Sequence, residues 1–122
     1  MPTFAYEFND ENAPQDFLPF AGFPYGAAHA SELQYLFDLR AAFPLTPLNP
    51  DQQHLAGNMT EYWTTFAANG NPNQPGTPNW PVFSVAATDM QSLVPPAPQT
   101  EFNFAVDHKC AFWDAAAGRK LP

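Results

Sequence analysis

The sequence predicts an α/β fold with few strands, about three helices and long proline-rich loops. Two segments, residues 3–8 and 101–107, alternate apolar side chains with polar or small ones, which is the period-two pattern of strands. Two others, residues 31–40 and 49–69, place apolar side chains at helical spacing. The chain also contains 15 prolines, so we expect long loops between these elements.

The first element is a strand over residues 3–8, in which every second residue from Phe4 to Phe8 is aromatic. The polar residues 9–12 end this strand. Residues 13–28 contain prolines and glycines without a steady period, which predicts a long loop.

A helix is predicted over residues 31–40. Ser31 is a favourable N-cap residue, and Gln34, three residues later, completes a capping box. Leucine and phenylalanine follow at i, i+3 and i+4 spacing. Pro44 and the prolines after it prevent the helix from continuing much further.

The helix predicted over residues 49–69 has the clearest boundaries. Asn49 is the cap, Pro50 occupies the first helical position and Gly70 ends the helix. Its apolar positions fall at i, i+4, i+7, i+8 and i+11, namely Leu55, Met59, Tyr62, Trp63 and Phe66.

The remainder is predicted as a proline-rich loop over residues 71–99, a strand over 101–107 and a short helix over 110–117. Trp80 and Phe83 provide apolar anchors within that loop. We expect residues 1–122 to form a single piece, because a chain of 122 residues is one domain at most.

Charge and composition exclude several classes of function. The net charge is −8 with only four Lys and Arg, so we expect neither a nucleic-acid partner nor an anionic membrane surface. No apolar run reaches the roughly 20 residues that span a bilayer, and no export signal is visible, so we expect a soluble chain. The histidines are scattered and there is one cysteine, so we expect no metal and no cofactor.

Four motifs in order resemble those of a known family. They are GAAHASELQYLF from Gly26, MTEYWTTFAANGNPN from Met59, WP at Trp80 and CAFWD from Cys110. Together they resemble the C-terminal part of a type-B carboxylesterase of the cholinesterase and para-nitrobenzyl esterase kind. The resemblance implies an incomplete α/β-hydrolase C-terminal section. It also implies that His29 is the general base of a Ser-acid-His triad acting on a carboxylic ester.

The nucleophile of such enzymes lies in a G-x-S-x-G motif, which this sequence lacks. We therefore expect a C-terminal part of an ester hydrolase that is completed by a missing N-terminal part and has no triad activity alone. One alternative is a stand-alone, non-catalytic module that self-associates. Another is a small self-sufficient esterase that uses His29 with an improvised serine such as Ser31. Open strand edges and apolar faces predict a homodimer.

Overall fold

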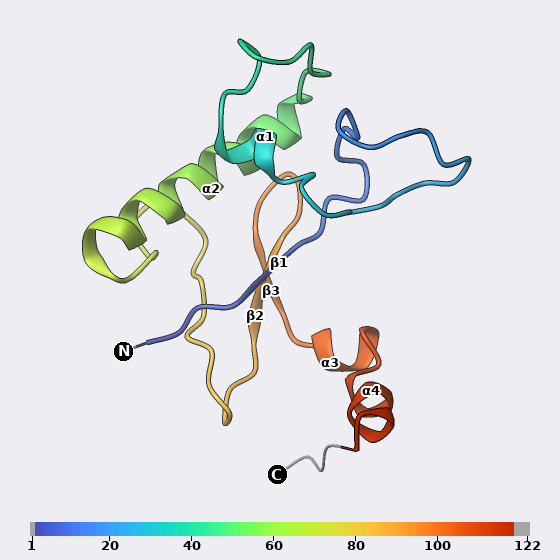
Figure 1. Ribbon diagram of the computed structural model, residues 1–122. Helices are drawn as coiled ribbons and strands as arrows, with labels where there is room; N and C mark the ends of the chain where they lie inside the picture. The colour runs from blue at the N-terminus through green and yellow to red at the C-terminus, as the bar shows by residue number, and fades with distance from the viewer. Residues whose placement is uncertain (1, 119–122) are drawn as a thin grey trace.

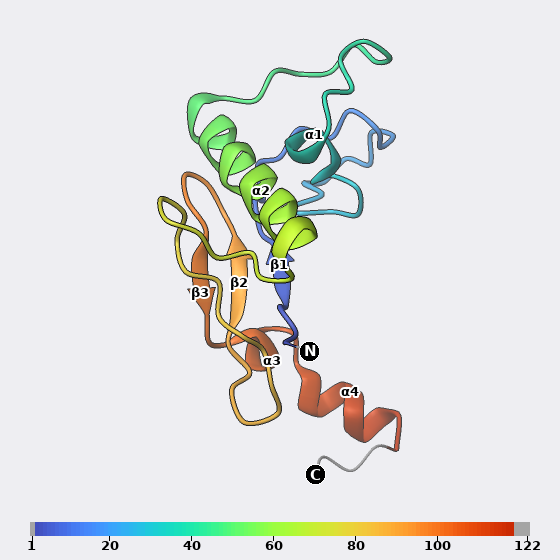
Figure 2. The ribbon, with the colours of Figure 1, turned by 90° about the vertical axis from the view of Figure 1, so that its left-hand side faces the viewer.

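The computed structural model describes residues 2–118 and contains three strands and four helices (Figure 1). In chain order they are β1 (Tyr6–Phe8), α1 (Leu33–Leu36), α2 (Pro50–Asn69), β2 (Met90–Leu93), β3 (Gln99–Glu101), α3 (Phe104–Asp107) and α4 (Cys110–Ala116). Figures 1 and 2 show α1 and α2 toward one end of the sheet and α3 and α4 toward the other. No helix in residues 2–118 combines the length and hydropathy that crossing a bilayer requires.

The strands form one sheet in the order β1-β2-β3. β1 pairs in parallel with β2, with Tyr6 opposite Gln91, and β2 pairs with β3 in the antiparallel sense. Parallel strands need a crossover connection, and the chain from α1 through α2 supplies it. The carboxyl ends of β1 and β2 therefore lie at the same edge of the sheet, where Asn9 extends the pairing by donating to the carbonyl of Leu93 at 3.0 Å.

α2 has the boundaries that its sequence predicts. The Asn49 side chain accepts from the Gln52 amide at 3.0 Å, and the Gln52 side chain accepts from the Asn49 amide at 3.0 Å. This reciprocal pair is a capping box, which satisfies two amide groups that the helix leaves free. Gly70 ends α2 with a φ of 70°, in the left-handed region that glycine enters at little cost.

The core lies between α2 and the sheet. Leu55, Met59 and Tyr62 of α2 and Leu93 of β2 are each 0% exposed, and Ala13, Tyr35 and Trp80 complete the buried cluster. Trp80 anchors the long loop before β2, because its indole N–H donates to the Ala5 carbonyl at 2.9 Å. The predicted anchoring role of Trp80 is therefore confirmed.

The first two predicted elements are shorter in the structure. The strand predicted over residues 3–8 is β1, Tyr6–Phe8, and Thr3 forms only an isolated bridge with Phe83. The helix predicted over residues 31–40 is α1, Leu33–Leu36, because Phe37 is extended at φ −129° and ψ 136°.

The loop predicted over residues 71–99 contains the central strand of the sheet. All four residues of β2 are buried, and the strand pairs on both edges, with β1 and with β3. The prediction was wrong here because Gln91 and Ser92 interrupt the apolar residues that normally indicate a buried strand.

The strand predicted over residues 101–107 is also wrong. β3 ends at Glu101, whose carboxylate accepts from the Asn103 amide and turns the chain. Residues 104–107 then form α3, in which the Asn103 carbonyl accepts from Val106 at 2.8 Å. The apolar side chains that alternate along this segment do not share a buried sheet face, since Phe102 is 72% exposed. The final helix, predicted over 110–117, is α4.

Candidate active site

His29 lies in the loop that connects β1 to α1. The chain leaves the carboxyl end of β1, makes a long excursion and returns toward α1 (Figure 1). Gly26 and His29, three residues apart, both lie in this loop. The carboxyl ends of parallel strands are where ligands bind in open α/β sheets. His29 is exposed and occupies a turn immediately before α1.

A tight turn presents His29. The Ala28 carbonyl accepts from the Ser31 amide at 3.1 Å, so His29 and Ala30 are the two central residues. Ala30 has a φ of 70°, and a positive φ at the second central residue is the feature of a type II turn. Because alanine rarely adopts this conformation, the turn requires support from the surrounding structure.

Ser31 supplies part of that support and is not a helix cap. Its hydroxyl donates to the Ala28 carbonyl at 2.6 Å, and the residue is 4% exposed. The N-cap residue of α1 is Glu32, which makes no capping hydrogen bond with its side chain. The predicted capping box of Ser31 and Gln34 is therefore wrong, because the hydroxyl is engaged with the preceding turn.

The imidazole of His29 forms no hydrogen bond or ion pair within residues 2–118, whereas the preceding carbonyls of Gly26 and Ala28 are each held by a side chain. A triad base needs a carboxylate on one ring nitrogen and a serine on the other. Neither is bonded to His29 among the described residues. Ser92 is 5% exposed and accepts from Asn9 at 3.3 Å, and Ser84 accepts from the Ala87 amide at 3.0 Å.

A buried carboxylate group, Asp10, fixes the elements around this loop. Asp10 is 4% exposed, accepts from the Tyr35 hydroxyl at 2.5 Å and accepts from the Gln52 side chain at 2.9 Å. It thereby joins the end of β1 to both α1 and α2. Burial and this hydrogen bond raise the pKa of Tyr35. Nothing in the sequence distinguished Asp10 from its polar neighbours, because its role depends on contacts with distant residues.

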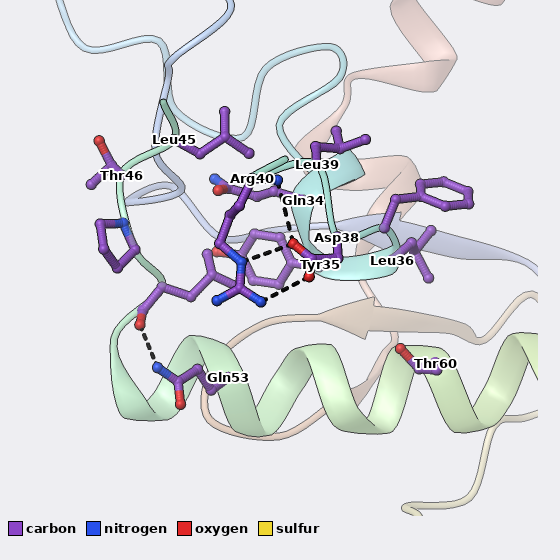
Figure 3. A pocket seen from close by; sticks show the side chains of 13 residues that line it. Gln34, Tyr35, Leu36, Asp38, Leu39, Arg40, Leu45, Thr46, Gln53 and Thr60 are labelled. Atoms are coloured by element: carbon purple, nitrogen blue, oxygen red, sulfur yellow. Dashed lines mark hydrogen bonds and ion pairs between the residues drawn. The ribbon is translucent and has the colours of Figure 1, made fainter. Parts of the chain in front are cut away.

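Two hollows of the surface lie away from His29. A cavity of about 440 Å³ lies between α1, the following loop and α2 (Figure 3). In it Arg40 and Asp38 form an exposed ion pair at 2.8 Å. A smaller cavity of about 210 Å³ is apolar and is lined by Phe4, Tyr6, Tyr62, Trp63, Phe66, Pro72 and Trp80. His29 lines neither cavity, so neither provides a substrate pocket next to it.

The other histidines occupy unrelated places. His54 is exposed on α2. The ring Nε2 of His108 lies 2.7 Å from the Glu7 carboxylate, and the ring stacks on Phe104 with centroids 4.2 Å apart. Among residues 2–118, no group of three or more His, Cys, Asp or Glu side chains could hold a metal ion.

Comparison with known sequences identifies relatives along nearly the whole chain. The sequence pattern of the carboxylesterase family matches residues 1–113. Human cocaine esterase is 28% identical over 120 residues, which cover 98% of this chain and 21% of that protein. Acetylcholinesterase of Bungarus fasciatus is 28% identical over 122 residues, covering 92% of this chain and 18% of that protein. The chain thus spans about a fifth of the length of these relatives.

Solved structures show the same fold. An esterase from Clostridium hathewayi superposes with a TM-score of 0.64 and 24% identity, over 87% of this chain and 20% of that one. PNB esterase superposes with a TM-score of 0.62 and 23% identity, over 89% of this chain and 21% of that one. The three strands and their helices therefore have the arrangement of a section of an α/β-hydrolase esterase.

Proposed function

The chain belongs to the carboxylesterase family, and on this premise we propose that it is the C-terminal part of a carboxylic-ester hydrolase whose general base is His29. One observation supports this above the others. The backbone that leads into His29 is fixed by hydrogen bonds to the carbonyls of Gly26 and Ala28, while the imidazole stays exposed and free of partners within residues 2–118. Such a histidine can still accept a carboxylate and a serine.

In this proposal His29 moves one proton twice. Its imidazole takes the proton of a serine hydroxyl as the serine oxygen attacks the ester carbonyl, and then gives the proton to the leaving alcohol. Water then attacks the acyl-serine in the same way: His29 takes a proton from the water and returns it to the serine oxygen, and the carboxylic acid is released. The serine, the triad carboxylate and the oxyanion-hole donors come from outside the residues described. The role of this chain is to hold the base at the carboxyl edge of the sheet.

The proposal is tested with a chimera in which residues 1–113 replace the matching section of PNB esterase. We expect the chimera to hydrolyse a chromogenic ester and its serine to react with a fluorophosphonate probe. His29→Ala should lower kcat by at least about a thousandfold, because a triad works as a unit. His54→Ala is the matched control, since it removes another exposed histidine and should leave kcat unchanged.

Two outcomes contradict the proposal. The first is a folded chimera whose kcat is unaffected by His29→Ala. The second is a folded chimera in which the serine does not react with the probe although the unmodified PNB esterase does react. Circular dichroism of every variant establishes that the comparison is made between folded proteins.

A second candidate function is that of a self-associating module without triad chemistry. Two observations favour it: β1 is an edge strand of the sheet, and large apolar side chains are exposed, with Phe20 at 98% and Val85 at 90%. Open edges and apolar patches both favour association, and a symmetric dimer is the commonest closed form.

Light scattering at several protein concentrations tests this second function. We expect a dimer whose formation strengthens with added salt, because each protomer carries a net charge of −8 and salt screens the repulsion between them. A folded monomer at every concentration and ionic strength would refute it.

A further inference from the structure

We propose that Gln15 is the positioning residue of His29, holding the loop of the base by its side-chain amide. This inference rests on the proposed function, because it assigns a partner to the same site. Gln15 lies 11 positions before Gly26 in the sequence and is half-buried. Nothing in its sequence context pointed to this role.

The Gln15 amide bridges the two ends of the excursion that precedes the turn. Its Nε2 group donates to the Ala13 carbonyl at 3.0 Å and to the Gly26 carbonyl at 2.9 Å. Ala13 is itself buried in the core. The amide therefore ties the start of the His29 loop to a residue that cannot move without disturbing the core.

The Gly26 carbonyl continues the link toward His29. It accepts a second hydrogen bond, at 2.9 Å, from the Ala28 amide. The carbonyl of Ala28, two residues further along, is held by the Ser31 hydroxyl. Side chains thus set the positions of two of the three carbonyls from Gly26 to Ala28. The imidazole takes part in none of these bonds.

The Gln15 bridge is important because the backbone from Gly26 to Ala30 needs support to keep its conformation. Gly26 and Ala30 have φ values of 63° and 70°, so the segment from Gly26 to Ala30 begins and ends with a residue in the left-handed region. A catalytic side chain must keep its productive position within about 0.5 Å. Loss of the bridge would release the Gly26 end of the loop and widen the range of positions that the His29 ring visits.

The test compares Gln15→Met with Gln53→Met in the 122-residue chain. Methionine keeps the length of glutamine but donates no hydrogen bond. Gln53 is the matched control, because its amide also donates to a backbone carbonyl, that of Leu48 at 2.7 Å, but lies away from the His29 loop. The readout is the NMR order parameter of the His29 backbone amide, with hydrogen exchange of the Ala28 and Ser31 amides.

We expect an order parameter near about 0.85 in the original chain and in Gln53→Met, and below about 0.6 in Gln15→Met. Exchange at the Ala28 amide should become about tenfold faster, which corresponds to the loss of about one ordinary hydrogen bond. Amides in α2 should exchange at unchanged rates. An unchanged order parameter in Gln15→Met, or an equal fall in Gln53→Met, would overturn the proposal.

The same substitutions in the PNB esterase chimera separate this inference from the proposed function. Gln15→Met should lower kcat about tenfold and leave KM unchanged, because a misplaced base impairs the reaction and not the binding of the ester. If His29→Ala abolishes turnover while Gln15→Met does not change it, His29 is the base and the positioning role is wrong. If neither changes kcat, the proposed function fails.

Discussion

Replacing Gln91 with methionine is expected to stabilise the protein. Gln91 lies in the middle of β2, opposite Tyr6 on one side and Thr100 on the other, and is 0% exposed. Both polar atoms of its side chain, Nε2 and Oε1, are buried without a hydrogen-bond partner among the described residues. Leu93, two positions along the strand and therefore on the same face, belongs to the apolar core.

The magnitude follows from the two unpaired atoms. A buried amide without partners costs about 1–3 kcal/mol relative to an apolar group of the same shape. Methionine has a similar length and no amide, so it removes this cost without opening a cavity. The backbone bond from the Gln91 amide to the Ala5 carbonyl, at 3.0 Å, is kept. We therefore expect the free energy of unfolding to rise by about 1–3 kcal/mol.

Urea denaturation followed by tryptophan fluorescence measures this change. Trp80 lies in the same core and reports its loss. The midpoint should rise at constant slope, because the surface exposed on unfolding hardly changes. The melting temperature should rise by about 4 °C for each kcal/mol in a chain of this length.

Gln99→Met is the control, because Gln99 is exposed in the neighbouring strand β3. It should change the free energy of unfolding by less than about 0.5 kcal/mol. If Gln91→Met leaves stability unchanged or lowers it, the amide of Gln91 is hydrogen-bonded in solution and the reasoning from its burial is refuted.

Three further predictions concern the serine, a buried tyrosine and the cap of α2. A fluorophosphonate probe should not label Ser31 in the purified chain, because that hydroxyl is buried and bonded to the Ala28 carbonyl; stoichiometric labelling that disappears in His29→Ala would instead support a self-sufficient esterase. Burial raises the pKa of Tyr62 from 10.0 to about 12, so its stabilising effect is complete below about pH 10 and is lost as the pH rises toward about 12. Tyr62→Phe should reduce this loss of stability at alkaline pH, measured by urea titrations at about pH 8 and pH 11. At the lower pH the variant should be less stable by about 1 kcal/mol, because it loses the hydrogen bond to the Pro78 carbonyl at 2.6 Å. An unchanged pH dependence of stability would contradict the raised pKa of Tyr62. Asn49→Ala should cost about 1 kcal/mol by removing the capping box of α2, and a midpoint equal to that of the original chain would show that the cap contributes nothing.

Local signals explain where the sequence predicted the fold well. The boundaries of α2 follow from a cap, a helical repeat and a glycine, all within one segment. β2 was missed because it becomes a strand through its pairing with β1, and its own residues include Gln91 and Ser92. A segment as short as residues 101–107 fits the strand and helix periods almost equally well, and the turn at Asn103 decided between them.

In the candidate site, too, a local motif predicted one part and contacts with distant residues determine the rest. The motif around His29 was enough to predict it as the candidate base, through the resemblance to carboxylesterases. The geometry of its loop could not be predicted, because it depends on Gln15 and on the left-handed conformation of Ala30. Neither residue type is unusual at such a position in a sequence. Only the folded chain shows that the Gln15 amide donates to the Ala13 and Gly26 carbonyls and that Ala30 has a positive φ.

The parallel pairing of β1 with β2 also sets the order in which the chain can fold. Asn9 at the end of β1 contacts Ser92, which is 83 positions away. Contacts between residues so distant in sequence form slowly, because a long segment must be ordered before they can form. During synthesis α2, whose hydrogen bonds are local, can form before β2, the strand that pairs with β1 in this structure, has been made. The strand that leads to His29 can therefore pair with β2 only after β2 has left the ribosome.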